Sequence, residues 1–107
     1  MEAKKWVNWS LNAMLMVGEL YDYLVEVMGE PKSDEYIEEL MDFGNSLEIK
    51  SDFHSFCRNH KLQTAGYRCA LFRKKYIIIY KTDEKRVNIL GVLHAKRSPQ
   101  AFEDLIE

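Results

Sequence analysis

An unbroken run of apolar β-forming residues, Tyr76-Ile77-Ile78-Ile79-Tyr80, limits most strongly what this chain can fold into. A strand with one wet face alternates polar and apolar residues, whereas a continuous apolar run predicts a strand covered on much of both faces. We therefore predict that Tyr76–Lys81 is an internal strand. The rest of the chain has to supply the neighbouring strands and the layers that cover the sheet.

The first half of the sequence supplies two amphipathic helices. Ser10 stands where an N-cap belongs, and Gly29 and Pro31 end the helix that follows it. Ser33 is the predicted N-cap of a second helix. Apolar residues recur at helical spacing in both segments, and the short break between them predicts an antiparallel hairpin. The apolar positions are Leu11, Met14, Leu15, Gly18, Tyr21, Val25 and Met28 in the first helix, and Tyr36, Ile37, Leu40, Met41, Gly44 and Leu47 in the second.

The remaining segments predict strands, with one irregular connection and a short last helix. In the final strand the odd-numbered positions form the more apolar side, and Gly91 marks a bulge or a close backbone approach. Ser98-Pro99 has the arrangement that starts a helix. The predicted strands are Lys4–Trp9, Tyr67–Phe72, Tyr76–Thr82 and Arg86–Leu93, the irregular connection is Ser51–Gly66, and the last helix is Pro99–Ile106.

This order, β-α-α-β-β-β with a possible short C-terminal helix, predicts an α+β fold. Helices that precede a block of strands favour a mainly antiparallel sheet of three to four strands, with the helix hairpin on one face. The other face is then concave and partly open. The residues predicted to form the core are Leu15, Tyr21, Val25, Ile37, Leu40, Met41, Ile77, Ile79 and Ile89.

The 107 residues predict a single domain spanning 1–107. No apolar run approaches the length of a membrane span, and the polar start Met1–Lys5 does not resemble a signal peptide. The spacing of Cys57 and Cys69 suggests neither a disulfide framework nor a metal site, and no cofactor is indicated. We therefore expect a cytoplasmic protein with both thiols reduced.

The net charge of −2 hides a strong asymmetry between the halves of the chain. Residues 1–52 carry four Lys and twelve acids, a net of −8, whereas residues 53–107 carry eleven Lys/Arg and five acids, a net of +6. Such a division suggests two surfaces with two tasks. A plainer interpretation is that the helices carry solvated Glu while the strands carry solvated Lys.

Three segments, in order and spacing, make the chain resemble the RelE/ParE superfamily of bacterial toxins from end to end. The first is Val7–Ala13 running into Glu19–Leu24, and the second is the strand Lys75–Lys81. The third, Val87–Pro99, is the most specific, because it is similar to the "V-x-I-L-x-V-L-H-x-x-R-x-P" ending of the superfamily. Each motif alone is largely a strand or helix pattern, so the likeness depends on all three together.

The resemblance implies the toxin of a type II toxin–antitoxin pair, acting in the bacterial cytoplasm to inhibit growth or stabilise a plasmid. The implied partner is a cognate antitoxin whose disordered C-terminal segment folds as it binds along the apolar groove beside the helices and sheet. ParE-like members block DNA gyrase without known chemistry. RelE-like members cut mRNA on the ribosome, using basic residues of the sheet with a His or Tyr near the C-terminus.

The basic half contains the residue types that RNA cleavage requires. A neutral His can exchange protons near pH 7, and Arg can hold the scissile phosphate. For a RelE-like activity the candidate catalytic residues are His94, Arg68 and Arg73. Strand alternation places Arg68 on one side with Ala70 and Phe72, so a face shared with His94 is possible. For either activity the candidate target-binding residues are Arg68, Arg73, Lys75, Lys96 and Arg97.

The ending His94–Pro99 favours the ParE-like branch. RelE-like nucleases commonly place a catalytic aromatic residue near the end of the last strand, but the only aromatic residue after His94 is Phe102, which has no hydroxyl. His94 can equally end a strand with a satisfied hydrogen bond. We therefore favour a non-enzymatic inhibitor of gyrase, then a ribosome-dependent mRNA endoribonuclease, then a non-toxic module that only binds antitoxin.

Overall fold

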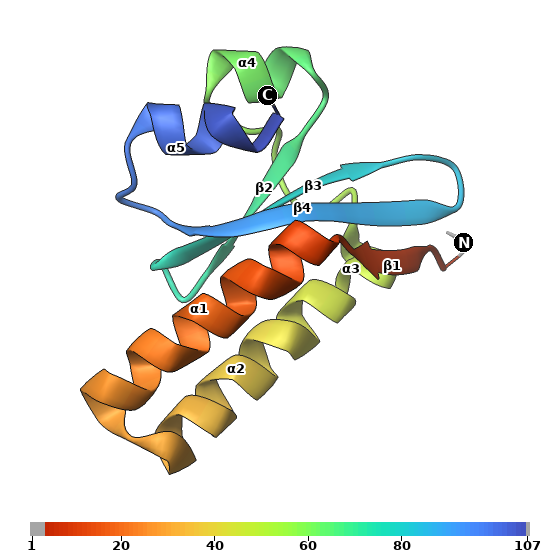
Figure 1. Cartoon of the computed structure of the whole chain (residues 1–107). Helices are drawn as coiled ribbons and strands as arrows, with labels where there is room; N and C mark the ends of the chain where they lie inside the picture. The colour runs from red at the N-terminus through yellow and green to blue at the C-terminus, as the bar shows by residue number, and fades with distance from the viewer. Residues whose placement is uncertain (1–3, 107) are drawn as a thin grey trace.

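A computed structural model describes residues 4–106, with helices on both sides of one sheet (Figure 1). The helices α1 and α2 form a long hairpin on one side, and α4 and α5 lie on the other. The strands are β1 (Trp6–Trp9), β2 (Arg68–Phe72), β3 (Tyr76–Thr82) and β4 (Arg86–His94); the helices are α1 (Leu11–Met28), α2 (Glu30–Asn45), α3 (Leu47–Lys50), α4 (His60–Thr64), α5 (Pro99–Glu103) and the 3-10 helix η1 (Asp104–Ile106).

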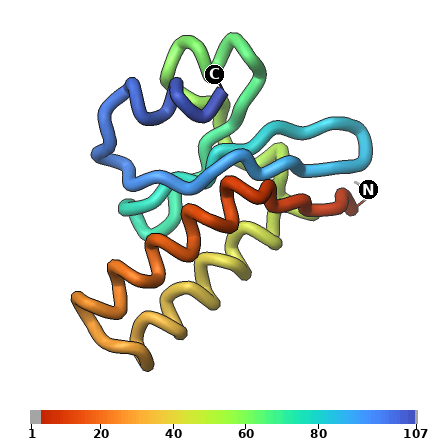
Figure 2. Tube along the Cα trace, viewed as in Figure 1, coloured from red at the N-terminus to blue at the C-terminus, as the bar shows by residue number. Residues whose placement is uncertain are grey.

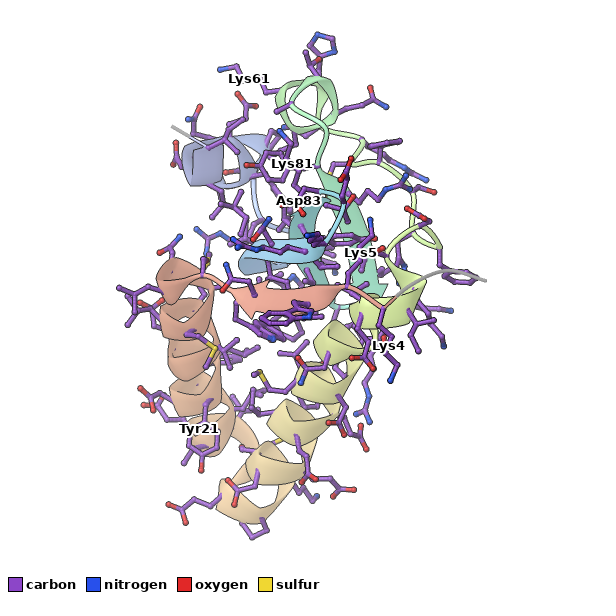
Figure 3. The ribbon with its side chains drawn as sticks, turned by 90° about the vertical axis from the view of Figure 1, so that its right-hand side faces the viewer. Lys4, Lys5, Tyr21, Lys61, Lys81 and Asp83 are labelled. Carbon is purple, nitrogen blue, oxygen red and sulfur yellow. A yellow bond between two sulfur atoms is a disulfide. The ribbon has the colours of Figure 1, made fainter. Side chains whose placement is uncertain are left out.

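The four strands form a mixed sheet in the order β1-β4-β3-β2. The pairs β2–β3 and β3–β4 are antiparallel, and β1 runs parallel to β4. The side chain of Lys5 extends this edge, since its Nζ donates to the carbonyl oxygen of Asp83 at 2.9 Å (Figure 3). The α+β fold, the element order and the internal position of β3 are therefore confirmed.

The helix hairpin begins and turns at defined residues. The Oγ of Ser10 accepts a hydrogen bond from the N–H of Ala13 at 3.0 Å, which confirms the predicted cap of α1. Gly29, at φ 83°, makes the turn and is itself the N-cap of α2. The prediction that Ser33 caps α2 is wrong: Ser33 lies inside the helix, and its hydroxyl donates to the carbonyl oxygen of Gly29 at 2.7 Å. A serine hydroxyl can form this bond one turn back as readily as it can cap a helix.

A hydrogen bond between side chains ties the two helices together near their exposed turn. The hydroxyl of Tyr21 donates to Oδ1 of Asp34 at 2.6 Å, and this bond, more than burial, raises the pKa of Tyr21 to about 12. Figure 3 shows Tyr21 on the outer part of α1, away from the sheet.

The hairpin reaches the sheet through a close contact between α2 and β1. An added Cβ at buried Gly44 would lie 2.4 Å from Cζ2 of Trp9 and 3.3 Å from Cδ1 of Ile78. The Trp9 Nε1–H also donates to Oδ1 of Asn45 at 2.9 Å. The indole therefore occupies the space that any side chain at position 44 would need.

Two apolar clusters cover the two faces of the sheet, as the central run predicts. Ile78 and Tyr80 belong to the cluster beneath α1 and α2, whereas Ile79 belongs to the cluster beneath α4, α5 and η1. Ile78, Ile79 and Tyr80 are fully buried. Figure 2 shows α5 beside α4, on the side of the sheet opposite the hairpin. The far face is therefore more covered than the sequence predicts.

Most of the predicted core residues are buried or packed against the core. The prediction that Leu15 belongs to the core is wrong, because its side chain is 57% exposed. The core-facing side of α1 is formed by Ala13, Val17 and Leu24, and Leu15 lies two residues, about 200° around the helix, from Val17. Leu40, Ile79 and Ile89 are fully buried, Ile37, Met41 and Ile77 are partly buried against the clusters, and Tyr21 and Val25 are half-buried.

A bulge in β4 changes which residues face the helices. Tyr80 pairs with Ile89 and Ile79 pairs with Gly91, so Leu90 is an extra residue. The prediction that the odd-numbered residues of the last strand form its apolar side is therefore wrong beyond the bulge. There Val92 belongs to the helix-side cluster and Leu93 to the cluster on the far face. The expectation for Gly91 is confirmed, since an added Cβ would lie 2.9 Å from Sδ of Met16.

The connection after α3 is pinned to the edge of the sheet by a covalent bond. Phe56 pairs with Arg68 in an isolated antiparallel bridge, which brings the Cα atoms of Cys57 and Cys69 to 4.9 Å. The two cysteines form a disulfide, so the prediction of reduced thiols is wrong. Their separation in sequence gives no sign of this pairing, which the strand bridge creates.

A search of residues 4–106 for a helix with the length and hydropathy of a membrane span finds none.

Candidate functional site

Most of the predicted target-binding residues meet at one end of the sheet. The backbone N–H of Ala95 donates to the carbonyl oxygen of Lys75 at 2.7 Å, which joins the β2–β3 turn to the chain leaving β4. We name this region the basic end; it comprises Arg73, Lys75, His94, Lys96 and Arg97. Through the ion pair of Arg73 with Glu39, the basic end also touches the acidic side of α2.

Arg73 is held in place rather than free in solvent. Its backbone has a left-handed conformation, φ 50°, in the turn between β2 and β3. Its guanidinium forms an ion pair with Glu39 of α2 and lies 5.1 Å from the ring centroid of Tyr36. Burial raises the pKa of Tyr36, and the charge of Arg73 opposes that shift. The cation is thereby presented from a fixed position, while Lys75, Lys96 and Arg97 are exposed beside it.

His94 ends β4 with its ring packed and one nitrogen engaged. The imidazole lies edge-on to Tyr76, with ring centroids 5.2 Å apart. Its Nδ1 accepts a hydrogen bond from the backbone N–H of Lys96 at 3.0 Å. In a neutral ring, an Nδ1 that accepts a hydrogen bond leaves the proton on Nε2. The expected satisfied hydrogen bond is present.

Arg68 lies apart from the basic end. It shares the helix-side face with His94, but it pairs with Tyr80, whereas His94 pairs with Tyr76. Four residues along the strand and two strands across place their Cα atoms about 17 Å apart. The guanidinium of Arg68 donates to the carbonyl oxygen of His54 at 2.6 Å and stacks 4.1 Å from the centroid of Phe56. The structure therefore brings five of the six candidate residues together and leaves Arg68 out.

His54, which lies beside Arg68, is a half-buried histidine that the sequence did not single out. Its ring contacts Phe43, Phe53 and Tyr80. Burial lowers the pKa of His54, and the charges of Lys50 and Arg68 lower it further. This histidine has a structural environment, and nothing places it near the basic end.

An exposed apolar stripe runs along the first turns of α1. Leu11 is 77% exposed, Leu15 57% and Met14 43%, and Gly18 continues the stripe with no atom within 4 Å of an added Cβ. We name Leu11, Met14, Leu15 and Gly18 the α1 stripe. A signal for it was present in the sequence, since α1 has too many apolar residues for a single face. A contiguous apolar surface of this kind is typical of a protein-binding site.

The far face of the sheet contains a groove of about 650 Å³ between α4 and α5. Phe56, Leu71, Ile77 and Phe102 give it apolar walls, and Cys57, Cys69, Arg58 and Arg97 also line it. The strand residues that face this groove are uncharged. Among the described residues that line the groove, the cations are Arg58 and Arg97.

Comparisons with known proteins identify the fold. No protein-family model and no curated protein matches the sequence. A chain from the solved structure described as "Chromosomal ParDE TA system from P. aeruginosa" matches with a TM-score of 0.73 and 14% sequence identity, over 89% of this chain and 100% of that one. The resemblance suggested by the sequence is thus confirmed at the level of the fold. The present chain has the fold of a chain in a ParDE TA system.

Proposed function

We propose that this protein is the ParE-like toxin of a toxin–antitoxin pair, acting in the bacterial cytoplasm. The observation that carries the proposal is the match of the whole fold to a chain of a ParDE TA system. The sequence motifs of β1–α1, β3 and β4, which resemble those of the RelE/ParE superfamily, agree with it. The cellular target is a protein, with DNA gyrase favoured by the ParE-like ending of the sequence.

The α1 stripe is the proposed site for the antitoxin. Its apolar side chains have more than 40% of their surface exposed at three successive positions of the stripe. A disordered antitoxin segment that folds as an amphipathic helix would cover them and gain the apolar burial that offsets its ordering. The acidic side chains of α2, the other helix of the hairpin, favour an antitoxin segment that also carries Lys or Arg.

The basic end is the proposed site for the target. Lys75, Lys96 and Arg97 are exposed within one region, with Arg73 fixed behind them by Glu39. Exposed cations grouped in this way attract an acidic protein surface and accelerate encounter with it. No proton transfer is needed for such binding, which agrees with an imidazole whose Nδ1 is already engaged.

The decisive experiment is induction of this chain in a bacterial host, with and without the gene adjacent to it. A gyrase inhibitor should halt growth and induce the DNA-damage response while translation continues at first. Co-expression of the cognate antitoxin should restore growth. Early arrest of translation, with cleaved mRNA ends in the ribosomal A site, would instead establish the endoribonuclease. Full expression without harm would establish a non-toxic antitoxin-binding module.

A further inference from the structure

We infer that the Cys57–Cys69 disulfide in the groove on the far face is a reversible thiol-exchange site for small acidic thiols, and that its opening releases the edge segment Asp52–Asn59 from the sheet. The bond joins the end of an irregular connection to edge strand β2. Both cysteines line the groove, so the bond faces a space that a small molecule can enter.

The two sulfurs differ in access. Cys57 is 1% exposed, whereas Cys69 is half-buried and belongs to the wall of the groove. An incoming thiolate therefore attacks Sγ of Cys69, and the S–S bond breaks with Cys57 leaving as the thiolate. A second thiol then attacks the mixed disulfide at the sulfur of the first and releases Cys69. Two small thiols are oxidised to their disulfide, the protein is reduced to two thiols, and the disulfide form of the same thiol reverses the reaction.

The charges at the rim select an acidic thiol. Arg58 and Arg97 both line the groove and are exposed. Within residues 4–106, neither guanidinium is paired with a carboxylate. Two unpaired cations beside the bond attract a thiol that carries carboxylates, and they stabilise its thiolate.

The disulfide is the strongest restraint on the edge segment. Apart from it, this segment is joined to β2 and Tyr67 by the backbone bonds Cys57 N–H to Tyr67 O and Cys69 N–H to Ser55 O, and by the contacts of Arg68 with His54 and Phe56. The His54 ring also contacts Phe43 and Tyr80, and the side chain of Asn59 donates to Glu103. Phe53 and Phe56 are 79% and 48% exposed even with the bond closed. Opening the bond therefore changes the wall of the groove without requiring the central strands to separate.

The redox state of the cytoplasm bears on the role of this disulfide. Disulfides in a reducing cytoplasm are usually transient and redox-sensing rather than structural. A redox-sensing role rests on the proposed cytoplasmic location. The exchange itself does not, since it depends only on the access, charge and tethering described above.

The test follows native protein, without denaturant, in reduced glutathione, whose carboxylates make it an acidic thiol, and in mercaptoethanol, which is uncharged. Free thiols are trapped with a maleimide and assigned by mass spectrometry, while trypsin cleavage after Arg58 reports release of the segment and circular dichroism reports the fold. We expect a mixed disulfide on Cys69 at early times, complete reduction with the fold retained at the end, and faster cleavage after Arg58. The double variant Cys57→Ser/Cys69→Ser should be cleaved rapidly whether or not thiol is present.

The variant Arg97→Gln tests the selection of acidic thiols. It should lower the rate with glutathione about threefold or more relative to the rate with mercaptoethanol, and added salt should reduce the difference. Reduction that occurs only under unfolding conditions, free thiols in protein never exposed to reductant, or unchanged cleavage after reduction would each overturn the inference. None of these readouts involves toxicity, so a failure here is distinct from a failure of the proposed function.

Discussion

Two glycines in the hairpin helices are in opposite environments and provide a matched test of packing. Gly44→Ala would place a Cβ at 2.4 Å from the rigid ring of Trp9, whereas Gly18→Ala meets nothing within 4 Å. We expect Gly44→Ala to destabilise the protein by about 1–3 kcal/mol through overpacking. Gly18→Ala should stabilise it by about 0.5–1 kcal/mol through helix propensity. Urea unfolding of both variants checks the prediction, and equal effects would contradict the described β1–α2 contact.

At the basic end, one pair of variants separates binding from chemistry. In a protein-binding toxin, Arg97→Ala should weaken toxicity at least as much as His94→Ala, because each removes only a contact. In a nuclease, His94→Ala should lower the cleavage rate on the order of a hundredfold or more. Toxicity is scored by colony counts after induction, with melting temperature and antitoxin binding as controls for folding. Full toxicity of both Arg97→Ala and Lys96→Ala would show that the basic end is not the working surface.

Among elements, α1 allows the proposed antitoxin site to be tested within a single helix. Leu15→Glu places a charge in the α1 stripe, and Val27→Glu makes the same change at a site that is 61% exposed but about 120° away around the helix. Both positions are exposed, so neither variant should lose more than about 1 kcal/mol of stability. Leu15→Glu should reduce antitoxin affinity at least about tenfold, the effect of roughly 1.4 kcal/mol. Titration calorimetry measures it, and equal affinities for the two variants would argue against the stripe.

Elements were predictable from the sequence where a single physical signal dominates. The apolar run of β3 predicts its bounds, its internal position and its cover, and Ser10 predicts the start of α1. Leu15 was misplaced because α1 is apolar on two sides, so periodicity alone does not choose the buried one. The functional surfaces required more than periodicity. The bulge at Leu90 sets the face of His94, and the bridge at Phe56 brings the cysteines together. Both depend on how one strand pairs with another, which the periodicity of a single segment does not determine.

For the whole molecule, the shifted pKa values predict that acid destabilises the fold in two ranges. His54 has its pKa lowered from 6.5 by burial, so the unfolded chain binds its proton first and stability falls as the pH drops below about 6.5. The pKa values of Asp83 and Glu103 are lowered from 3.8 and 4.5 by hydrogen bonds, first from the N–H of Lys85 and from Asn59. Their stabilisation is present above those values and is lost as the pH falls below them.

Melting temperatures between pH 8 and 3 check both ranges, taken at roughly half-unit steps across the pKa values concerned. His54→Phe should keep the ring contacts with Phe43 and Tyr80. It should abolish the loss of stability that begins below about pH 6.5 and leave the loss at lower pH unchanged. The carboxylate range should persist in that variant. A His54→Phe profile that still declines just below pH 6.5 would contradict the assignment.

The parallel pairing of β1 with β4 determines when this chain can finish folding. Trp6 pairs with Arg86, so the first strand waits for a partner that is synthesised 80 residues later. At about 5–20 residues per second, translation takes roughly 4–16 s to cover that distance. The α1–α2 hairpin closes through local contacts during this interval, while the sheet that carries the basic end is still incomplete. A nascent chain therefore exposes the α1 stripe, the proposed antitoxin site, before the basic end, the proposed target site, is assembled, so an antitoxin present during synthesis would bind first.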